Sequence, residues 1–222
     1  MRFNRRTQSK KARLTILMTP KIDAATIQEH RALRQQQIID AAMSLALEDG
    51  AHAVTISAVA SRAKLSRSLI YEYFSSSSDL IADLVVEEMN LYTAKLQSAT
   101  RNLDDPYEVL AAWISESLKY VADGRHLLVK SLNSIATPEF RRDDIIQGHR
   151  KLMSTIMPTL IRLKAHEPDL ALRYLQSTID AASVRIDSGA DAAQEITAAQ
   201  HYALAGLRAL EDVARTEAIH RI

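Results

Sequence analysis

Helix-breaking residues are rare in this chain and lie far apart. Its 222 residues include only five glycines and five prolines, while 47% of them are hydrophobic. Short strands need turn residues at close intervals, whereas long stretches rich in Ala, Leu and Ile favour helices. Because this hydrophobic content suffices for a packed core, the sequence predicts an all-α globular protein.

The apolar residues recur at helical spacing, and polar or helix-breaking stretches divide the chain between them. We predict helices over residues 30–49, 56–63, 67–74, 79–102, 106–123, 125–136, 138–165, 168–186 and 191–218. Thr55 and Ser66 precede the two short helices, where a hydroxyl can cap the free backbone amides. Pro158 lies inside the predicted 138–165 helix and is expected to kink it.

The residue types that catalytic and metal sites require form no recognisable pattern. The chain contains no cysteine, which excludes disulfides, thiolate metal ligands and cysteine nucleophiles. It contains no glycine-rich phosphate loop, no G-x-S-x-G turn and no H-E-x-x-H pair. Asp123 and His126 have a spacing that can suit a metal, but Gly124 between them predicts a helix break. We expect no enzyme, no metal and no cofactor; a small helical enzyme with a scattered site stays an alternative.

The hydrophobic segments are too short for a membrane protein. No apolar run reaches the roughly 18 residues of a membrane span. The run from Leu14 to Met18 is also shorter than the apolar core of a signal peptide. We therefore expect a cytoplasmic protein.

Basic residues are concentrated at the N-terminus. Residues 1–21 contain seven Lys or Arg and no acidic residue, whereas the rest of the chain contains 21 basic and 27 acidic residues. A basic arm on a mildly acidic body indicates a polyanionic partner; a solvated tail is the alternative. We predict residues 1–29 as a flexible basic arm.

Residues 55–74 have the pattern of a helix-turn-helix, in which two short helices are joined by a three-residue link, 64–66. In this motif the second helix enters the major groove, about 12 Å wide, and presents its N-terminal side chains to the bases. Ser66, Arg67 and Ser68 hold those positions. Two packed helices that do not bind DNA are the alternative interpretation.

The stretch from Arg34 to Leu84 resembles the N-terminal domain of the TetR family of transcriptional regulators. The matching residues are Ile38, Ile39, Asp40, Ala41, Ala42, Leu45, Gly50, Thr55, Ile56, Val59, Ala60, Ala63, Leu65, Ser66, Leu69, Ile70, Tyr71, Tyr73, Phe74 and Leu80. The resemblance implies a three-helix helix-turn-helix domain over residues 30–78. It also implies a larger helical ligand-binding and dimerisation domain over residues 79–222.

The resemblance further implies which residues contact DNA. Arg67, Ser68 and Glu72 would face the bases. The residues that would approach phosphates are Thr55, Ser57, Ser66, Tyr71, Tyr73 and Ser77.

Three positions depart from the family pattern. Lys64 stands where the family usually has glycine, and a left-handed turn there would strain the backbone by about 1 kcal/mol. The family often has glycine or another small residue at Ser68, and usually has a phosphate-binding lysine at Ser77. Residues 22–80 contain five basic and seven acidic residues, so the basic arm is expected to supply charge along the DNA backbone. A helical interaction module that has lost DNA binding is the alternative.

The last two predicted helices carry apolar and small residues that suit a four-helix interface between two copies. We predict that this interface contains Tyr174, Leu175, Thr178, Ala182, Ala199, Ala203, Leu207 and Leu210; packing within one copy is the alternative. We also expect a ligand cavity in this domain. Its candidate contacts are Trp113, Tyr120, His126, Arg141 and His149, although a core role for the tryptophan is the alternative.

These expectations describe a dimeric, ligand-responsive transcriptional regulator, most simply a repressor. Two recognition helices about 34–36 Å apart would read a pseudo-palindromic double-stranded operator. A small-molecule effector in the C-terminal domain would favour another spacing and release the DNA, with the 79–102 helix transmitting the change. The sequence leaves the identity of the effector and of the operator open.

Overall fold

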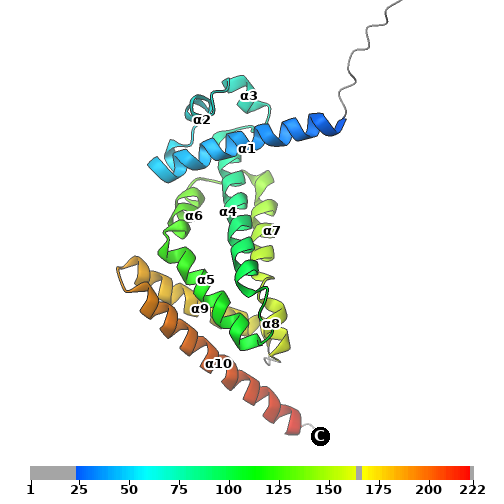
Figure 1. Cartoon of the computed structure of the whole chain (residues 1–222), viewed down its shortest axis with the longest axis vertical. Coiled ribbons are helices and arrows are strands. Elements are labelled where there is room, and N and C mark those ends of the chain that lie inside the picture. The colour runs from blue at the N-terminus through cyan, green and yellow to red at the C-terminus, as the bar shows by residue number, and fades with distance from the viewer. Residues whose placement is uncertain (1–23, 164–166, 221–222) are drawn as a thin grey trace, which may run out of the picture. The chain divides into compact units, whose positions relative to one another are not determined.

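The described part of the chain contains helices and short helical turns (Figure 1). The computed structural model describes residues 24–163 and 167–220. The elements are α1 (Ala24–Asp49), η1 (Ala51–Ala53), α2 (Ile56–Ala63), α3 (Arg67–Tyr71), α4 (Ser77–Thr100), α5 (Pro106–Ala122), α6 (Arg125–Asn133), η2 (Glu139–Arg141), α7 (Arg142–Met153), α8 (Met157–Arg162), α9 (Pro168–Asp187) and α10 (Ala192–His220). The all-α prediction is confirmed.

The chain divides within α1 into two compact units, residues 1–36 and residues 37–222. The described part of the first unit, residues 24–36, is helical. α1 thus begins six residues before the predicted start, because residues 24–29 contain good helix formers and no helix breaker. The basic segment over residues 1–21 lies outside the described residues.

The prediction of one kinked helix over residues 138–165 is wrong. The structure has a turn, η2, and two separate helices, α7 and α8, with Ser154–Ile156 between the helices. Pro158 causes the break, since it has no amide hydrogen and its ring would clash with the carbonyl of Ser154 in a continuous helix. At the start of α8 the missing amide is tolerated, because the first amides of a helix have no partner within it.

One buried core joins the helix-turn-helix to two helices that follow it in the chain. Its deeply buried residues include Ile38, Ala42, Val59, Ile70, Phe74, Leu80, Leu84 and Leu132. They come from the C-terminal half of α1 and from α2, α3, α4 and α6, together with the segment after α3. The chain segments that would meet DNA therefore share their core with α4 and α6.

A second core lies around α5, which contacts α4, α6, α8, α9 and α10. Its fully buried residues include Leu96, Leu110, Ile114, Leu118, Ile156, Leu160 and Ala171. α9 and α10 run antiparallel beside each other, and both pack on α5 (Figure 1). Within the described residues, no helix is long and apolar enough to span a bilayer.

Candidate functional site

The N-terminus of α2 is held by two hydroxyl groups from outside the helix. The Oγ1 atom of Thr55, the N-cap residue, accepts a hydrogen bond of 3.1 Å from the amide of Ala58. The Oγ atom of Ser77, at the start of α4, accepts one of 3.2 Å from the amide of Ile56. Two amides that a helix leaves free at its start are thus satisfied. The predicted cap is confirmed, and α2 is fastened to α4.

A left-handed residue makes the turn between α2 and α3. Lys64 has φ 56° and ψ 43°, and no other non-glycine residue in the described ranges has a positive φ. The amide of Leu65 then reaches the carbonyl of Ala60 at 2.9 Å and closes the end of α2. A side chain in this conformation costs about 1 kcal/mol relative to glycine, so the predicted strain is present.

α3 presents a polar face to solvent. Ser66 caps the helix, as predicted, by accepting a hydrogen bond of 3.1 Å from the amide of Leu69. Ile70 is fully buried in the core below. The exposed residues are Arg67, Ser68, Tyr71 and Glu72, whose spacing places them along one side of the helix. A guanidinium, two hydroxyls and a carboxylate are groups that contact base edges and phosphates in DNA complexes.

Arg67 also contacts the neighbouring helix. Its Nη2 atom donates a hydrogen bond of 2.7 Å to the Oγ atom of Ser57, in the first turn of α2. Both side chains are exposed. The structure therefore brings together two of the residues predicted to contact DNA, one from each helix of the motif.

Two of the nine predicted DNA contacts are less accessible than the other seven. Tyr73 is half-buried and packs against the core of the helix-turn-helix. Ser77 is also half-buried, and its oxygen already accepts the Ile56 amide, so its hydroxyl hydrogen is the group left to donate. Contact with DNA stays a prediction for all nine residues.

Four of the five candidate ligand residues make contacts within the protein, in separate places. Trp113 is buried, and its Nε1 atom donates to the Oγ1 atom of Thr155 at 2.8 Å. The Nε2 atom of His126 lies 2.8 Å from the carboxylate of Asp187. His149 is exposed on α7. The contacts of these residues are thus with different protein partners, and their role as ligand contacts stays a prediction.

Tyr120 belongs to a buried cluster around a carboxylate. Glu88 of α4 is 1% exposed; it accepts hydrogen bonds from the Tyr120 hydroxyl at 3.1 Å and from the Arg125 Nε at 2.8 Å. The ring of Tyr92 stacks on that of Tyr120, with centroids 4.1 Å apart. Burial raises the pKa of Tyr92 to about 12. It also raises the pKa of Tyr120, and the negative charge of Glu88 adds to the effect.

Arg141 links η2 to the first turns of α4. Its guanidinium pairs with Asp79 at 3.3 Å, with Asp83, and with Asp144 of α7 at 3.1 Å. Asp79 is buried and also accepts hydrogen bonds from the amide of Ser75 at 2.8 Å and from its hydroxyl at 3.0 Å. Arg141 therefore contacts the residue that holds the link between α3 and α4.

Sequence reasoning missed Asp79, Glu88 and Arg125. Glu88 and Arg125 are 37 residues apart, and Asp79 and Arg141 are 62 residues apart. No local spacing signals such pairs. Charged residues on a helix are ordinarily expected to be exposed to solvent. Only the burial of these side chains, which the sequence does not show, reveals that they are paired inside the protein.

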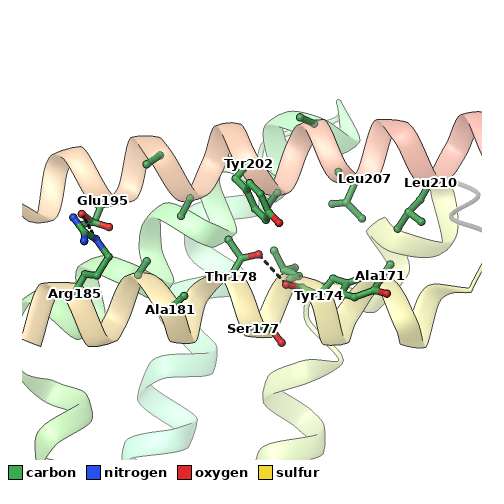
Figure 2. A pocket seen from close by; sticks show the side chains of 17 residues that line it. Ala171, Tyr174, Ser177, Thr178, Ala181, Arg185, Glu195, Tyr202, Leu207 and Leu210 are labelled. Carbon is green, nitrogen blue, oxygen red and sulfur yellow. Dashed lines mark hydrogen bonds and ion pairs between the residues drawn. The ribbon is translucent and has the colours of Figure 1, made fainter.

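An open groove runs between α9 and α10 (Figure 2). It has a volume of about 760 Å³ and is lined mainly by apolar and small side chains, among them Ala181, Ala198, Ala205 and Gly206. Tyr174 and Tyr202 stand at its sides and are 57% and 75% exposed. Arg185 and Glu195 form an ion pair of 2.8 Å across one end, as Figure 2 shows.

The predicted interface residues divide into two groups. Leu175, Ala182, Ala199, Ala203 and Leu207 are buried within the single chain, where they pack between α9, α10 and the rest of the second core. Tyr174, Thr178 and Leu210 are open to solvent to different degrees. The first group contributes the floor of the groove, because close helix packing covers all but a small part of these side chains.

Comparison with known proteins gives a consistent result. The sequence profile described as "Bacterial regulatory proteins, tetR family" matches residues 38–84. The fatty acid metabolism regulator protein of Bacillus subtilis (strain 168) is 25% identical over 150 residues, which are 66% of this chain and 77% of that protein. The HTH-type transcriptional regulator HbdR of Aromatoleum sp. (strain CIB) is 34% identical over 82 residues, 36% of each chain.

Solved structures share the fold. The regulator FadR of Bacillus subtilis, in complex with stearoyl-CoA, has a TM-score of 0.63 at 22% identity, over 77% of this chain and 98% of that one. The match over residues 38–84 covers the capped α2, the left-handed turn and the exposed face of α3. By that match, residues 38–84 belong to the tetR family of bacterial regulatory proteins, and the chain is similar to two transcriptional regulators.

Proposed function

We propose that this chain is a dimeric repressor that leaves its operator when it binds a fatty acyl-CoA thioester. The observation that carries DNA binding is the exposed face of α3, with Arg67, Ser68, Tyr71 and Glu72 on a helix whose N-terminus is capped and held. The effector class is supported by the similarity to a fatty acid metabolism regulator and to a structure that contains stearoyl-CoA. A regulator of this kind acts on the chromosome, hence in the cytoplasm.

A second copy of the chain is the proposed occupant of the α9–α10 groove. Its lining of alanines and Gly206 allows the helices of two copies to approach closely, and its exposed tyrosines would bury large apolar surface on association. Two helices from each copy would form a four-helix interface. The twofold axis would then present two α3 helices to successive major grooves, about 34–36 Å apart.

Two connections are the proposed route from the effector to DNA. Leu128 and Leu132 of α6 are part of the core under the helix-turn-helix. Arg141 is ion-paired with Asp79, whose carboxylate holds the link after α3. An effector that moves α6 or α7 against α4 would therefore change the position of α3. Effector and DNA would oppose each other by a coupling free energy of about 1–3 kcal/mol.

The basic segment over residues 1–21 is proposed to supply electrostatic attraction. The helix-turn-helix region is slightly acidic, and Ser77 replaces the basic residue typical of the family. Each arm residue that neutralises a phosphate adds about 0.9 to the slope of log affinity against log salt. Removing residues 1–21 should therefore weaken operator binding and flatten this slope, while sequence preference persists. Identical slopes for both chains would contradict the role of the arm.

The proposed function is tested with the full chain and an operator obtained by selection from random-sequence DNA. We expect stearoyl-CoA to raise the Tm and to weaken operator binding about 5- to 150-fold, whereas coenzyme A alone should do neither. If stearoyl-CoA does not change operator affinity, the proposed effector class is wrong, while the proposed role as a DNA-binding regulator is unaffected. Failure to select any sequence would instead favour an interaction module that has lost DNA binding.

A further inference from the structure

The hydrogen bond between Arg67 and Ser57 joins two rigid points. Ser57 is the second residue of α2, whose start is fixed by Thr55 on one side and by Ser77 on the other. Arg67 is the first residue of α3, whose start is fixed by Ser66. The backbones that carry the two side chains are therefore fixed by caps. The 2.7 Å hydrogen bond then restricts the long Arg67 side chain, which could otherwise rotate in solvent.

An arginine without such a contact would sample many rotamers in solvent. Its side chain has among the largest conformational freedoms of any residue, and ordering it on binding opposes association. A partner that holds the guanidinium before DNA arrives removes part of that cost. The gain in affinity applies only to DNA sequences that fit the held orientation of the guanidinium. Holding the side chain therefore increases discrimination between DNA sequences.

The contact leaves the guanidinium able to read a base. A guanidinium has five N–H groups, and the bond to Ser57 uses one of the two on Nη2. The other Nη2 hydrogen and those on Nη1 remain for the paired acceptors O6 and N7 of guanine. The oxygen of Ser57 is the acceptor in this bond, so its own hydroxyl hydrogen is free to donate to a phosphate oxygen.

We propose that Ser57 is a positioning residue for base readout by Arg67. Ser57 accepts the Nη2 hydrogen of Arg67 and donates its hydroxyl hydrogen to an operator phosphate. The phosphate contact then fixes where the Arg67 guanidinium lies relative to the base that it reads. This inference rests on the proposed DNA binding by α3. It gives Ser57 a role in specificity, beyond the phosphate contact that the family resemblance implies.

The experiment compares wild type, S57A, S57T, R67A and the double variant S57A/R67A, all as full chains. Wild type first selects its operator from random-sequence DNA. Affinities are then measured for that operator and for operators changed at each base pair in turn. R67A identifies the base pair that Arg67 reads, because discrimination there is lost.

We expect S57A to reduce discrimination at that base pair about 3- to 10-fold, with smaller changes elsewhere. S57T keeps a hydroxyl at the same place and should restore discrimination. In the R67A background, S57A should leave discrimination unchanged, because there is no guanidinium to position. Thermal unfolding of each variant checks that α2 is intact.

Three results would overturn the inference. S57A could weaken all sequences equally, which would make Ser57 a phosphate contact alone. S57A could leave every affinity unchanged. S57A and R67A could also act additively on discrimination. If R67A relaxes readout and S57A does not, this inference fails while the proposed function survives; if wild type selects no sequence, both fail.

Discussion

The helix-turn-helix and the helices after it satisfy their polar groups in different ways. Around α2 and α3, short-range hydroxyl caps bind amides three residues along the chain, as Thr55 and Ser66 do, and the charged side chains stay on the surface. In the later helices, a few charged side chains are instead buried and paired over long sequence separations. Glu88 with Arg125 and Asp79 with Arg141 are examples.

This difference matches the work that each region does. A DNA-reading surface needs free donors and acceptors on a rigid base, so its local bonds fix the backbone and leave side chains available. A region that changes shape on binding an effector needs contacts that hold one arrangement and break in another. Buried pairs between elements have this property, because the energy of such a pair depends steeply on geometry.

The largest expected effect distinguishes residues buried within one chain from residues at the proposed interface between two copies. Ala203 is buried within one chain, whereas Ala205 is exposed and lines the α9–α10 groove. Ala203→Glu should destabilise or unfold the chain, because a carboxylate is forced into the second core. Ala205→Glu should keep the helical content and Tm of the protomer but break the dimer. Sedimentation and thermal unfolding distinguish the two, and a fully dimeric A205E would remove this face from the interface.

Breaking one buried pair should cost more than breaking one exposed pair. Arg125→Ala leaves Glu88 buried without its cation, and we expect a loss of about 2–3 kcal/mol in the free energy of unfolding. This is below the range for a fully buried pair, because the Arg125 side chain is 30% exposed. Arg125→Ala combined with Glu88→Gln should recover part of the loss. Arg62 of α2 and Glu48 of α1 form an exposed ion pair of 2.8 Å. Chemical denaturation measures the loss in each variant. A loss in Arg125→Ala as small as that in Arg62→Ala would contradict the expected difference between buried and exposed pairs.

Arg67 provides the test of the DNA-reading face. Arg67→Ala should cost about 1–3 kcal/mol on the selected operator and relax preference at one base pair, with little change in Tm because the side chain is exposed. Binding to scrambled DNA of the same length is the control. An equal loss on both DNAs would show that Arg67 contacts phosphate only.

Lys64 tests the strain in the turn. Lys64→Gly should stabilise the chain by about 1 kcal/mol or less, since glycine adopts φ 56° freely but loses more entropy on folding. Thermal unfolding measures the change. Ser61→Gly, at an exposed position inside α2, is the matched control and should destabilise. A destabilised K64G would mean that the lysine side chain contributes contacts that outweigh the strain.

The smallest expected effect concerns pH at the exposed pair. The hydrogen bonds from Arg62 and Ser44 lower the pKa of Glu48 from 4.5 to about 2. A lowered pKa means that the contribution to stability is complete above pH 4.5 and is lost as the pH falls toward 2. The Tm difference between wild type and Arg62→Ala should therefore shrink from pH 5 to pH 2. A constant Tm difference over this pH range would show that protonation of Glu48 does not remove the contribution of the pair to stability.

Much of the fold was predictable from local patterns. The spacing of Ile38, Ala42 and Leu45 marks a helix face, and both hydroxyl caps follow from one residue type at one position. The prediction of one kinked helix over residues 138–165 was wrong, because a proline inside a helix can either kink it or end it. Which of the two occurs depends on the packing of neighbouring elements, which the local sequence does not show. The sequence could not show that Trp113, Tyr120, His126 and Arg141 each contact a protein partner, because residue type alone does not reveal which contacts a side chain makes.

By itself the sequence determined the helical class, the capped helix-turn-helix and the tetR-family match of that motif, since each depends on residues within a few turns of one another. Only the tertiary structure decided that Glu88 and Asp79 are buried, that Ala203 faces inward while Ala205 faces the groove, and that Ser57 meets Arg67. The physical reason is that burial and pairing depend on which helix faces pack together. That choice is made by the summed packing of the whole chain rather than by any one segment.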